Sequence, residues 1–112
     1  MSTVRRTRQL RRYELVPDYM DQFVPWWRTS LLPVRLRYGF HVDVAVLSRD
    51  TFEFMWIVSV DGDATRFEEC ERAYAASPER AAAFTGSPEF VVRQHISFVE
   101  DVDVAAQPST RP

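Results

Sequence analysis

Apolar and polar residues alternate along four short stretches of the chain, which is the pattern of β-strands that bury one face. The stretches cover residues 8–16, 40–49, 51–61 and 90–99. Only a short polar turn, residues 48–50, separates the second stretch from the third. These two stretches therefore predict an antiparallel hairpin.

Residues 19–37 follow a different period, with apolar side chains every three or four positions, which predicts one amphipathic helix. The predicted stripe consists of Met20, Phe23, Val24, Trp27, Leu31, Val34 and Tyr38. Pro25 and Pro33 lie inside this span and should kink or split the helix, because proline has no backbone N–H to donate. We expect Asp18 to cap the start of the helix and Gly39 to close its end.

Two shorter helices are predicted between the third and fourth strands. Thr65 and Glu68 have the spacing of a capping box, which marks the start of the first of these helices. Its expected buried face consists of Phe67, Cys70 and Tyr74. Ser77 followed by Pro78 predicts the start of the second helix, and the sequence Gly-Ser-Pro at 86–88 should end it.

The predicted order of elements is β-α-β-β-α-β. Because crossover connections are right-handed, this order predicts an α+β ferredoxin-like fold with an antiparallel sheet of spatial order 4-1-3-2 and both helical segments on one face. We expect one domain over residues 8–99. Residues 1–7 form a basic flexible arm in this prediction, and residues 100–112 form a tail that is acidic at first and then flexible.

The opposite face of the sheet suggests a partner. Even-numbered residues of the last three strands, including Val44 and Val46, are expected under the helices. Odd-numbered residues form a second face that is half apolar and half ionisable, and Ala45 and Leu47 belong to it in this assignment. Since such a face is too apolar to remain open to water, we predict a homodimer that pairs sheet against sheet.

Composition removes several classes of chemistry. The 112 residues include no lysine and no asparagine, which excludes lysine Schiff bases, the P-loop lysine and a Cys-His-Asn triad. The single cysteine, Cys70, excludes internal disulfides, and we expect it to be buried and not nucleophilic. The net charge of −2 gives no support for nucleic-acid binding, and no apolar stretch is long enough for a membrane span. We therefore expect a cytoplasmic protein.

Two pairs of residues are candidates for acid–base catalysis. His41 and Asp43 lie two positions apart on one strand, so the carboxylate could orient the imidazole as a base. Arg93 and His95 have the same spacing, and the guanidinium could hold an anionic oxygen while the imidazole moves a proton. The alternative for both pairs is a structural role in ion pairs across the dimer.

A metal site is not expected. His41, Asp43 and His95 imitate a two-His-one-carboxylate set, but the sheet order separates their strands by about 14 Å within one protomer. No cofactor is predicted; haem bound through one histidine, or a metal held across the dimer, remains as an alternative.

The aromatic residues predict where a ligand binds. The substrate-binding candidates between helices and sheet are Trp27, Tyr38, Phe54, Trp56 and Tyr74. Trp26 and Trp27 are adjacent and point about 100° apart on a helix, so one of them should line a pocket mouth or the dimer contact. Such a pocket suits a flat hydrophobic or aromatic molecule.

Several short motifs, in this order, resemble the NIPSNAP domain. They are Tyr13-x-Leu15-x-Pro17, the aromatic helix that ends near Gly39, Glu53-Phe54-x-Trp56, Asp61 with Arg66, and Ser77-Pro78-Glu79. The similarity covers about residues 8–99, and the chain departs from the pattern at Asp18 and Arg80. The resemblance implies the dimeric α/β-barrel superfamily, which includes cofactor-free oxygenases, isomerases, cyclases, haem-binding enzymes and proteins without known catalysis. It transfers no catalytic residue.

Together these observations predict a small cofactor-free enzyme. It would act on a hydrophobic aromatic or polyketide-like molecule by acid–base chemistry of the isomerase, cyclase or monooxygenase type. The alternative is a non-catalytic binding or interaction module.

Overall fold

The four predicted strands form one antiparallel sheet of order β2-β3-β1-β4. Read from its other edge, this is the predicted order 4-1-3-2, which is thereby confirmed. The computed structural model describes residues 5–105. The strands are β1 (Arg6–Leu15), β2 (His41–Ser48), β3 (Glu53–Asp61) and β4 (Val91–Val99). Residues 1–4 of the predicted arm and 106–112 of the predicted tail lie outside this range.

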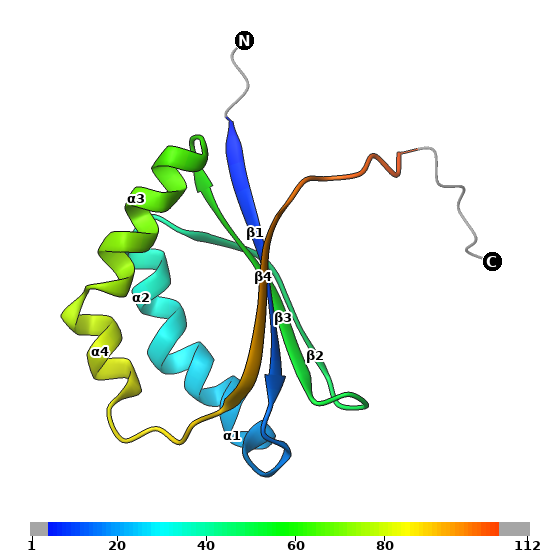
Figure 1. The fold of residues 1–112 in the computed structure, drawn as a ribbon, viewed down its shortest axis with the longest axis vertical. Helices are drawn as coiled ribbons and strands as arrows, with labels where there is room; N and C mark the ends of the chain where they lie inside the picture. Colours follow the sequence, from blue (N-terminus) through cyan, green and yellow to red (C-terminus); the bar gives the residue numbers. More distant parts are fainter. Residues whose placement is uncertain (1–4, 106–112) are drawn as a thin grey trace.

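All helical segments lie on one face of the sheet (Figure 1). They are η1 (Pro17–Tyr19), α1 (Met20–Trp26), η2 (Trp27–Leu31), α2 (Leu32–Arg37), α3 (Ala64–Ala75) and α4 (Pro78–Phe84). No helix within residues 5–105 covers the opposite face (Figure 1), which we call the outer face. Two layers therefore build the fold, and the core lies between them.

The predicted helix over residues 19–37 is split by its prolines. Pro25 lies inside α1, and Pro33 occupies the first turn of α2. Because Pro33 has no N–H for the carbonyl four residues earlier, the backbone widens between them into the π-helical turn η2. A π turn is equivalent to one inserted residue, which rotates all later side chains by about 100°. Arg35 therefore takes the buried position predicted for Val34, which is only partly buried.

The helix caps follow the predictions in part. Ser77 caps α4 as expected, since its Oγ accepts a hydrogen bond from the Arg80 N–H at 3.1 Å. The capping box at Thr65 is wrong, because the N-cap of α3 is Asp63, two residues earlier, whose side chain accepts from the N–H of Arg66 at 3.0 Å. The cap at Asp18 is also wrong, because Asp18 lies within the turn η1.

A β-bulge corrects the predicted faces of β2. The register with β3 shifts between Val42 and Val44, so Asp43 is an extra residue. After this bulge Val44 lies opposite Ile57, and Val46 opposite Met55. Since directly paired residues share a face, both valines lie on the outer face, where they are 44% and 48% exposed. The even-numbered assignment is therefore wrong for the part of β2 after the bulge, where Ala45 and Leu47 lie on the helix side. It holds in β3, where Phe54, Trp56 and Val58 are buried under the helices.

The core is mostly aromatic. The ring of Phe23 contacts four others, with centroid distances of 4.9 Å to Phe54, 5.4 Å to Phe90, 5.8 Å to Trp26 and 6.3 Å to Tyr13. Most of these contacts are edge-on or tilted, the arrangement that aromatic pairs prefer. On α3 the predicted buried face of Phe67, Cys70 and Tyr74 is confirmed.

Gly62 should tolerate alanine less well than Gly86. Both glycines have positive φ, 134° and 77°, where an L side chain is strained. A Cβ at Gly62 would also lie 2.9 Å from Arg66, whereas one at Gly86 would meet nothing within 4 Å. We expect Gly62→Ala to lower the free energy of unfolding by about 2 kcal/mol and Gly86→Ala by about 1 kcal/mol. Urea denaturation of the two variants measures this difference, and equal losses would contradict it.

Candidate ligand-binding cavity

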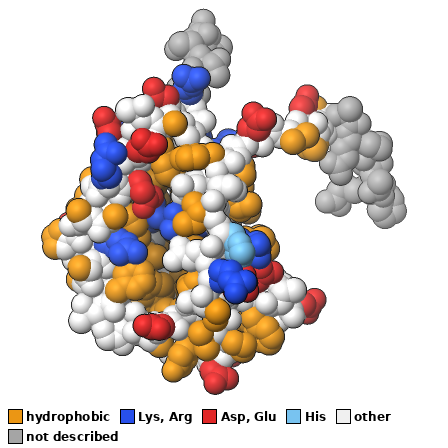
Figure 2. All heavy atoms as spheres, viewed as in Figure 1, with side chains coloured by type: hydrophobic (Ala, Val, Ile, Leu, Met, Phe, Trp, Pro, Cys, Tyr) orange, Lys and Arg blue, Asp and Glu red, His pale blue; other side chains and the backbone are white. Residues whose placement is uncertain are grey.

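A cavity of about 360 Å³ lies between the helices and the strands β1 and β4. Figure 2 shows it as a hollow beside β4, with hydrophobic walls and basic side chains within and around it. The aromatic side chains that line it are Tyr13, Phe23, Trp26, Tyr74, Phe84 and Phe90. Its volume falls in the range of small-molecule sites.

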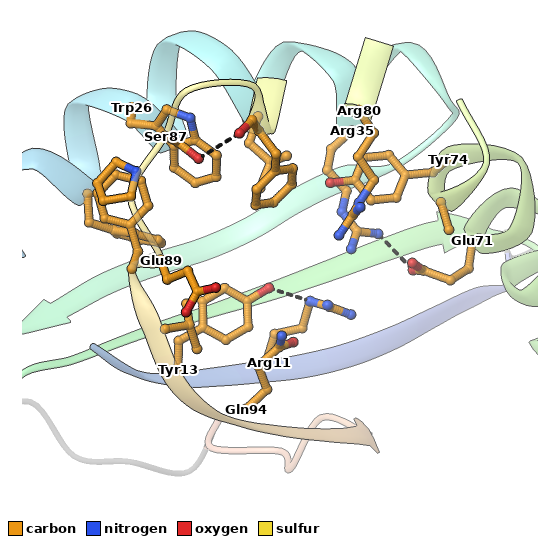
Figure 3. A pocket seen from close by; sticks show the side chains of 17 residues that line it. Arg11, Tyr13, Trp26, Arg35, Glu71, Tyr74, Arg80, Ser87, Glu89 and Gln94 are labelled. Atoms are coloured by element: carbon orange, nitrogen blue, oxygen red, sulfur yellow. Dashed lines mark hydrogen bonds and ion pairs between the residues drawn. The ribbon is translucent and has the colours of Figure 1, made fainter. Parts of the chain in front are cut away.

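Arg35 is buried and lines this cavity beside Tyr74 and Glu71 (Figure 3). It is 1% exposed, and its Nη1 donates to Glu71 Oε1 at 2.8 Å. Its guanidinium carbon lies 4.0 Å from the ring centroid of Tyr74 and 4.6 Å from that of Phe40. The Nε atom is buried and has no hydrogen-bond partner among the described residues. Arg35 therefore combines cation–π stabilisation with one donor that is not satisfied.

Arg80 and Arg11 also line the cavity. Arg80 on α4 lies 4.6 Å from the ring centroid of Phe84 and 5.5 Å from that of Tyr74. Burial raises the pKa of the Tyr74 hydroxyl, while Arg35 and Arg80 act in the opposite direction. Tyr74 is thus a neutral donor at pH 7.

Arg11 and Tyr13 form a hydrogen-bonded pair on β1. The Nε of Arg11 donates to the Tyr13 hydroxyl oxygen at 2.7 Å, and its Nη1 donates to Gln9 Oε1 at 2.8 Å. The three residues alternate along the strand and share its helix-side face. A hydroxyl that accepts one hydrogen bond still has its own hydrogen to donate. Tyr13 can therefore exchange a proton with a molecule in the cavity, beside a fixed positive charge.

The predicted catalytic residues lie on the outer face, away from this cavity. His41 Nε2 lies 3.3 Å from Asp61 Oδ2, whereas Asp43 accepts a hydrogen bond from Ser59 Oγ at 2.9 Å and pairs with Arg8 Nε at 3.0 Å. The structure thus gives His41 and Asp43 different partners.

The second predicted pair meets at one carboxylate. His95 donates from Nε2 to Glu14 Oε2 at 2.6 Å, and Arg93 Nη1 lies 3.9 Å from the same oxygen. Arg93, His95 and Glu14 all lie on the outer face. Within one protomer, the predicted catalytic and substrate-binding residues therefore lie on opposite sides of the sheet and do not form one site.

Comparison with known proteins places the fold. No protein-family model matches the sequence, and no curated protein matches it. A NIPSNAP family protein of unknown function from Agrobacterium tumefaciens superposes with a TM-score of 0.79 at 8% identity, over 92% of this chain and 94% of that chain. A NIPSNAP-like domain protein from Burkholderia xenovorans gives 0.77 at 13% identity, over 98% and 95%.

The chain has a NIPSNAP-like fold. The resemblance inferred from the sequence motifs is thereby confirmed at the level of the fold. At these identities the likeness concerns the fold alone, and the two neighbours carry no stated activity.

The predicted substrate-binding residues are scattered within the NIPSNAP-like fold. Tyr74 lines the cavity, whereas Trp27 and Phe54 line a separate groove between α1 and β2. Trp56 is fully buried in the core, and Tyr38 donates to Glu79 Oε1 at 2.8 Å. This bond to a carboxylate raises the pKa of the Tyr38 hydroxyl.

The separation of the adjacent tryptophans is confirmed. Trp27 packs in the core, and Trp26 lines the cavity, where its Nε1 donates to the Ala83 carbonyl at 2.9 Å. Arg11, Tyr13 and Arg35 line the cavity but were not among the predicted site residues. The alternation of β1 carried the signal for Arg11, because the residue shares a face with the predicted anchors Tyr13 and Leu15. Arg35 carried no such signal without the π turn.

Acid should weaken the outer face of this NIPSNAP-like domain. The hydrogen bond from His95 lowers the pKa of Glu14, and the hydrogen bonds from Arg6 and His41 lower that of Asp61. A carboxyl with a lowered folded-state pKa contributes stability above its unfolded value near 4.5 or 3.8, and loses it as the pH falls further. We expect the urea midpoint to fall between pH 6 and pH 3, and to fall less steeply in Glu14→Gln. A Glu14→Gln profile that parallels the wild type would contradict this assignment.

None of the helices within residues 5–105 is long and apolar enough to cross a membrane. The His, Cys, Asp and Glu side chains of the same residues form no group of three that could hold a metal ion.

Proposed function

We propose that the chain binds a flat hydrophobic molecule, aromatic or polyketide-like, in the cavity and transfers a proton of that molecule without a cofactor. The observation that carries the proposal is the hydroxyl of Tyr13, held by Arg11 at the wall of an aromatic-lined cavity. We therefore propose a reaction of the isomerase or cyclase type.

Tyr13 and Arg11 have complementary roles in this proposal. The Tyr13 hydroxyl first gives its proton to water. The phenolate then removes a proton from the carbon beside the ligand's carbonyl and returns it to another atom of the resulting enolate. Arg11 donates to the same oxygen, which stabilises the phenolate charge. The enolate that forms is also the electron-rich species that cofactor-free monooxygenation requires. These roles replace those predicted for His41, Asp43, Arg93 and His95, which face away from the cavity.

Exchange of hydrogen for deuterium in 2-tetralone tests the proton transfer. This bicyclic ketone carries enolisable hydrogens, and proton NMR in D₂O follows their loss. We expect the protein to accelerate exchange by about 100-fold or more over buffer, and Tyr13→Phe to return the rate to that of buffer. Tyr19→Phe, an exposed change of the same type on η1, should keep the wild-type rate. A wild-type rate equal to that of buffer would overturn the catalytic proposal.

The non-catalytic alternative has its own support. Both histidines, the strongest acid–base side chains of the chain at neutral pH, are engaged with carboxylates on the outer face. Under this alternative, 2-tetralone raises the melting temperature while its hydrogen exchange stays at the buffer rate.

We also propose that the outer face pairs with a second copy of the chain. Its apolar residues are Leu10, Val44, Val46, Met55, Ile57 and Val99. The charged groups around them already have partners within the chain, such as Arg6 with Asp61 and Arg12 with Glu53. An identical face is therefore a suitable cover, since it brings apolar area and no unpaired charge.

Light scattering with size-exclusion chromatography tests this pairing. We expect a dimer at tens of micromolar, and a monomer for Val46→Glu. Leu36→Glu, at an exposed position on the helix side, should leave the dimer intact. A wild-type monomer would overturn the proposal.

We also propose that the protein is located in the cytoplasm. The single cysteine, Cys70, is buried and free, which supports this location.

A further inference from the structure

We infer that the ligand of the cavity carries a carboxylate, and that this carboxylate competes with Glu71 for the charge of Arg35. The inference rests on the proposed function, because it names the class of molecule that the same cavity takes. It goes further by assigning a charged anchor and a competitor within the chain. The ligand class is an aromatic carboxylate, with its ring against the aromatic walls and its acid group at Arg35.

The first support is the unsatisfied donor of Arg35. A buried N–H of a charged group without an acceptor is costly, so most such groups in proteins are paired. Arg35 is 1% exposed and lines the cavity, and its Nε has no partner among the described residues. A guanidinium offers parallel donors that match the two oxygens of a carboxylate. A ligand carboxylate would supply the missing acceptor.

The second support is the balance of charge around the cavity. Three arginines line it, Arg11, Arg35 and Arg80, and the carboxylates that line it are those of Glu71 and Glu89. Glu89 is exposed on the loop before β4, where water screens its charge. The buried part of the cavity is therefore cationic and aromatic, which favours an aromatic anion over a neutral molecule of the same shape.

The third support is the unequal burial of the ion pair itself. The side chain of Glu71 is 32% exposed, whereas that of Arg35 is 2% exposed. Glu71 can therefore rotate from the edge of α3 into water, while Arg35 is held by the rings of Tyr74 and Phe40. A ligand carboxylate and the Glu71 carboxylate compete for one guanidinium. Glu71 thus sets the affinity of the cavity for acids.

Binding of 2-naphthoate and 2-naphthamide by titration calorimetry tests the inference, because the two molecules share shape and differ in charge. We expect the wild-type protein to bind the acid at least about 10-fold more tightly than the amide. This is the difference in affinity that one charge-assisted hydrogen bond contributes. Glu71→Gln should tighten binding of the acid by about 5-fold or more and leave the amide unchanged. Glu68→Gln removes the same charge at an exposed position of α3 and should change neither affinity.

The outcomes separate the inference from the proposed function. Equal affinity for acid and amide would overturn the carboxylate and leave the cavity as a binding site. Binding of neither molecule would overturn both. A Glu71→Gln variant that binds the acid no more tightly would overturn the competition. If that variant does not fold, Arg80→Gln replaces it. Arg80→Gln should weaken the acid by about 3-fold or more and leave the amide unchanged, and equal changes in both would overturn the inference.

Discussion

Replacing Trp56 with alanine should lower the free energy of unfolding by about 3–5 kcal/mol. Trp56 is 0% exposed at the centre of β3, and its ring centroid lies 5.1 Å from that of Trp27 and 6.3 Å from that of Tyr13. Removing the indole leaves a space that these rigid aromatic neighbours cannot fill, so the loss includes both burial and the remaining cavity. Urea denaturation at pH 7 measures it.

Trp26→Ala is the matched control for this prediction. Trp26 has the same side chain but is only partly buried, because one side of its ring lines the ligand cavity. We expect it to cost roughly half as much as Trp56→Ala, since less apolar surface leaves water when its ring packs. Equal losses would show that the core is not centred on β3.

Replacing Arg35 with alanine should cost about 2–5 kcal/mol, mainly because it removes a buried side chain that packs on Tyr74 and Phe40. The pair with the partly exposed Glu71 contributes less, because Glu71 can turn into water. Arg35→Met, which keeps the volume and removes the unsatisfied Nε, should recover most of this loss. Unfolding by urea at pH 7 compares the two variants.

Arg37→Ala provides the control for Arg35. Arg37 lies on the same helix with a side chain that is 67% exposed, so its ion pair with Glu79 should contribute less than about 1 kcal/mol. The Arg35→Ala result would be contradicted by a loss as small as that of Arg37→Ala. Arg35→Met also separates stability from ligand binding. We expect this variant to fold and to lose the preference of the cavity for acids.

The topology of the fold could be predicted because it depends on the order and approximate length of elements. Alternation located four strands, and a three-residue turn joined two of them. The right-handed crossover rule then left one natural sheet order. The sheet order does not depend on the exact residue at which an element begins, so the errors at Asp18 and Thr65 did not affect it.

The faces of the elements were harder to predict, because a single extra residue reverses or rotates everything after it. In β2 the bulge at Asp43 moved Val44 and Val46 to the outer face, and nothing in the local sequence marks that bulge. In the first helical segment the π turn exchanged Val34 for Arg35. Pro33 predicted a break in the helix there, but the backbone conformation at the break depends on the packing of the whole segment.

The candidate site was predicted least well, since its residues were selected by chemical type before their faces were settled. His41 and His95 have suitable chemistry, and their side chains lie on the wrong side of the sheet for the cavity. Tyr74 was found because it belongs to the buried stripe of a regular helix. Tyr13 and Arg11 required the face of β1, and Arg35 required the π turn.

The bulge at Asp43 also bears on the solubility of the protein. β2 is an edge strand, and its residues 42–47 are apolar apart from Asp43. A regular apolar strand at an edge offers free backbone groups to other chains and seeds aggregation. The bulge bends and twists β2, so that its free backbone groups do not form a regular row. A chain without Asp43 would present five consecutive apolar residues at the edge, and we would expect it to precipitate during folding.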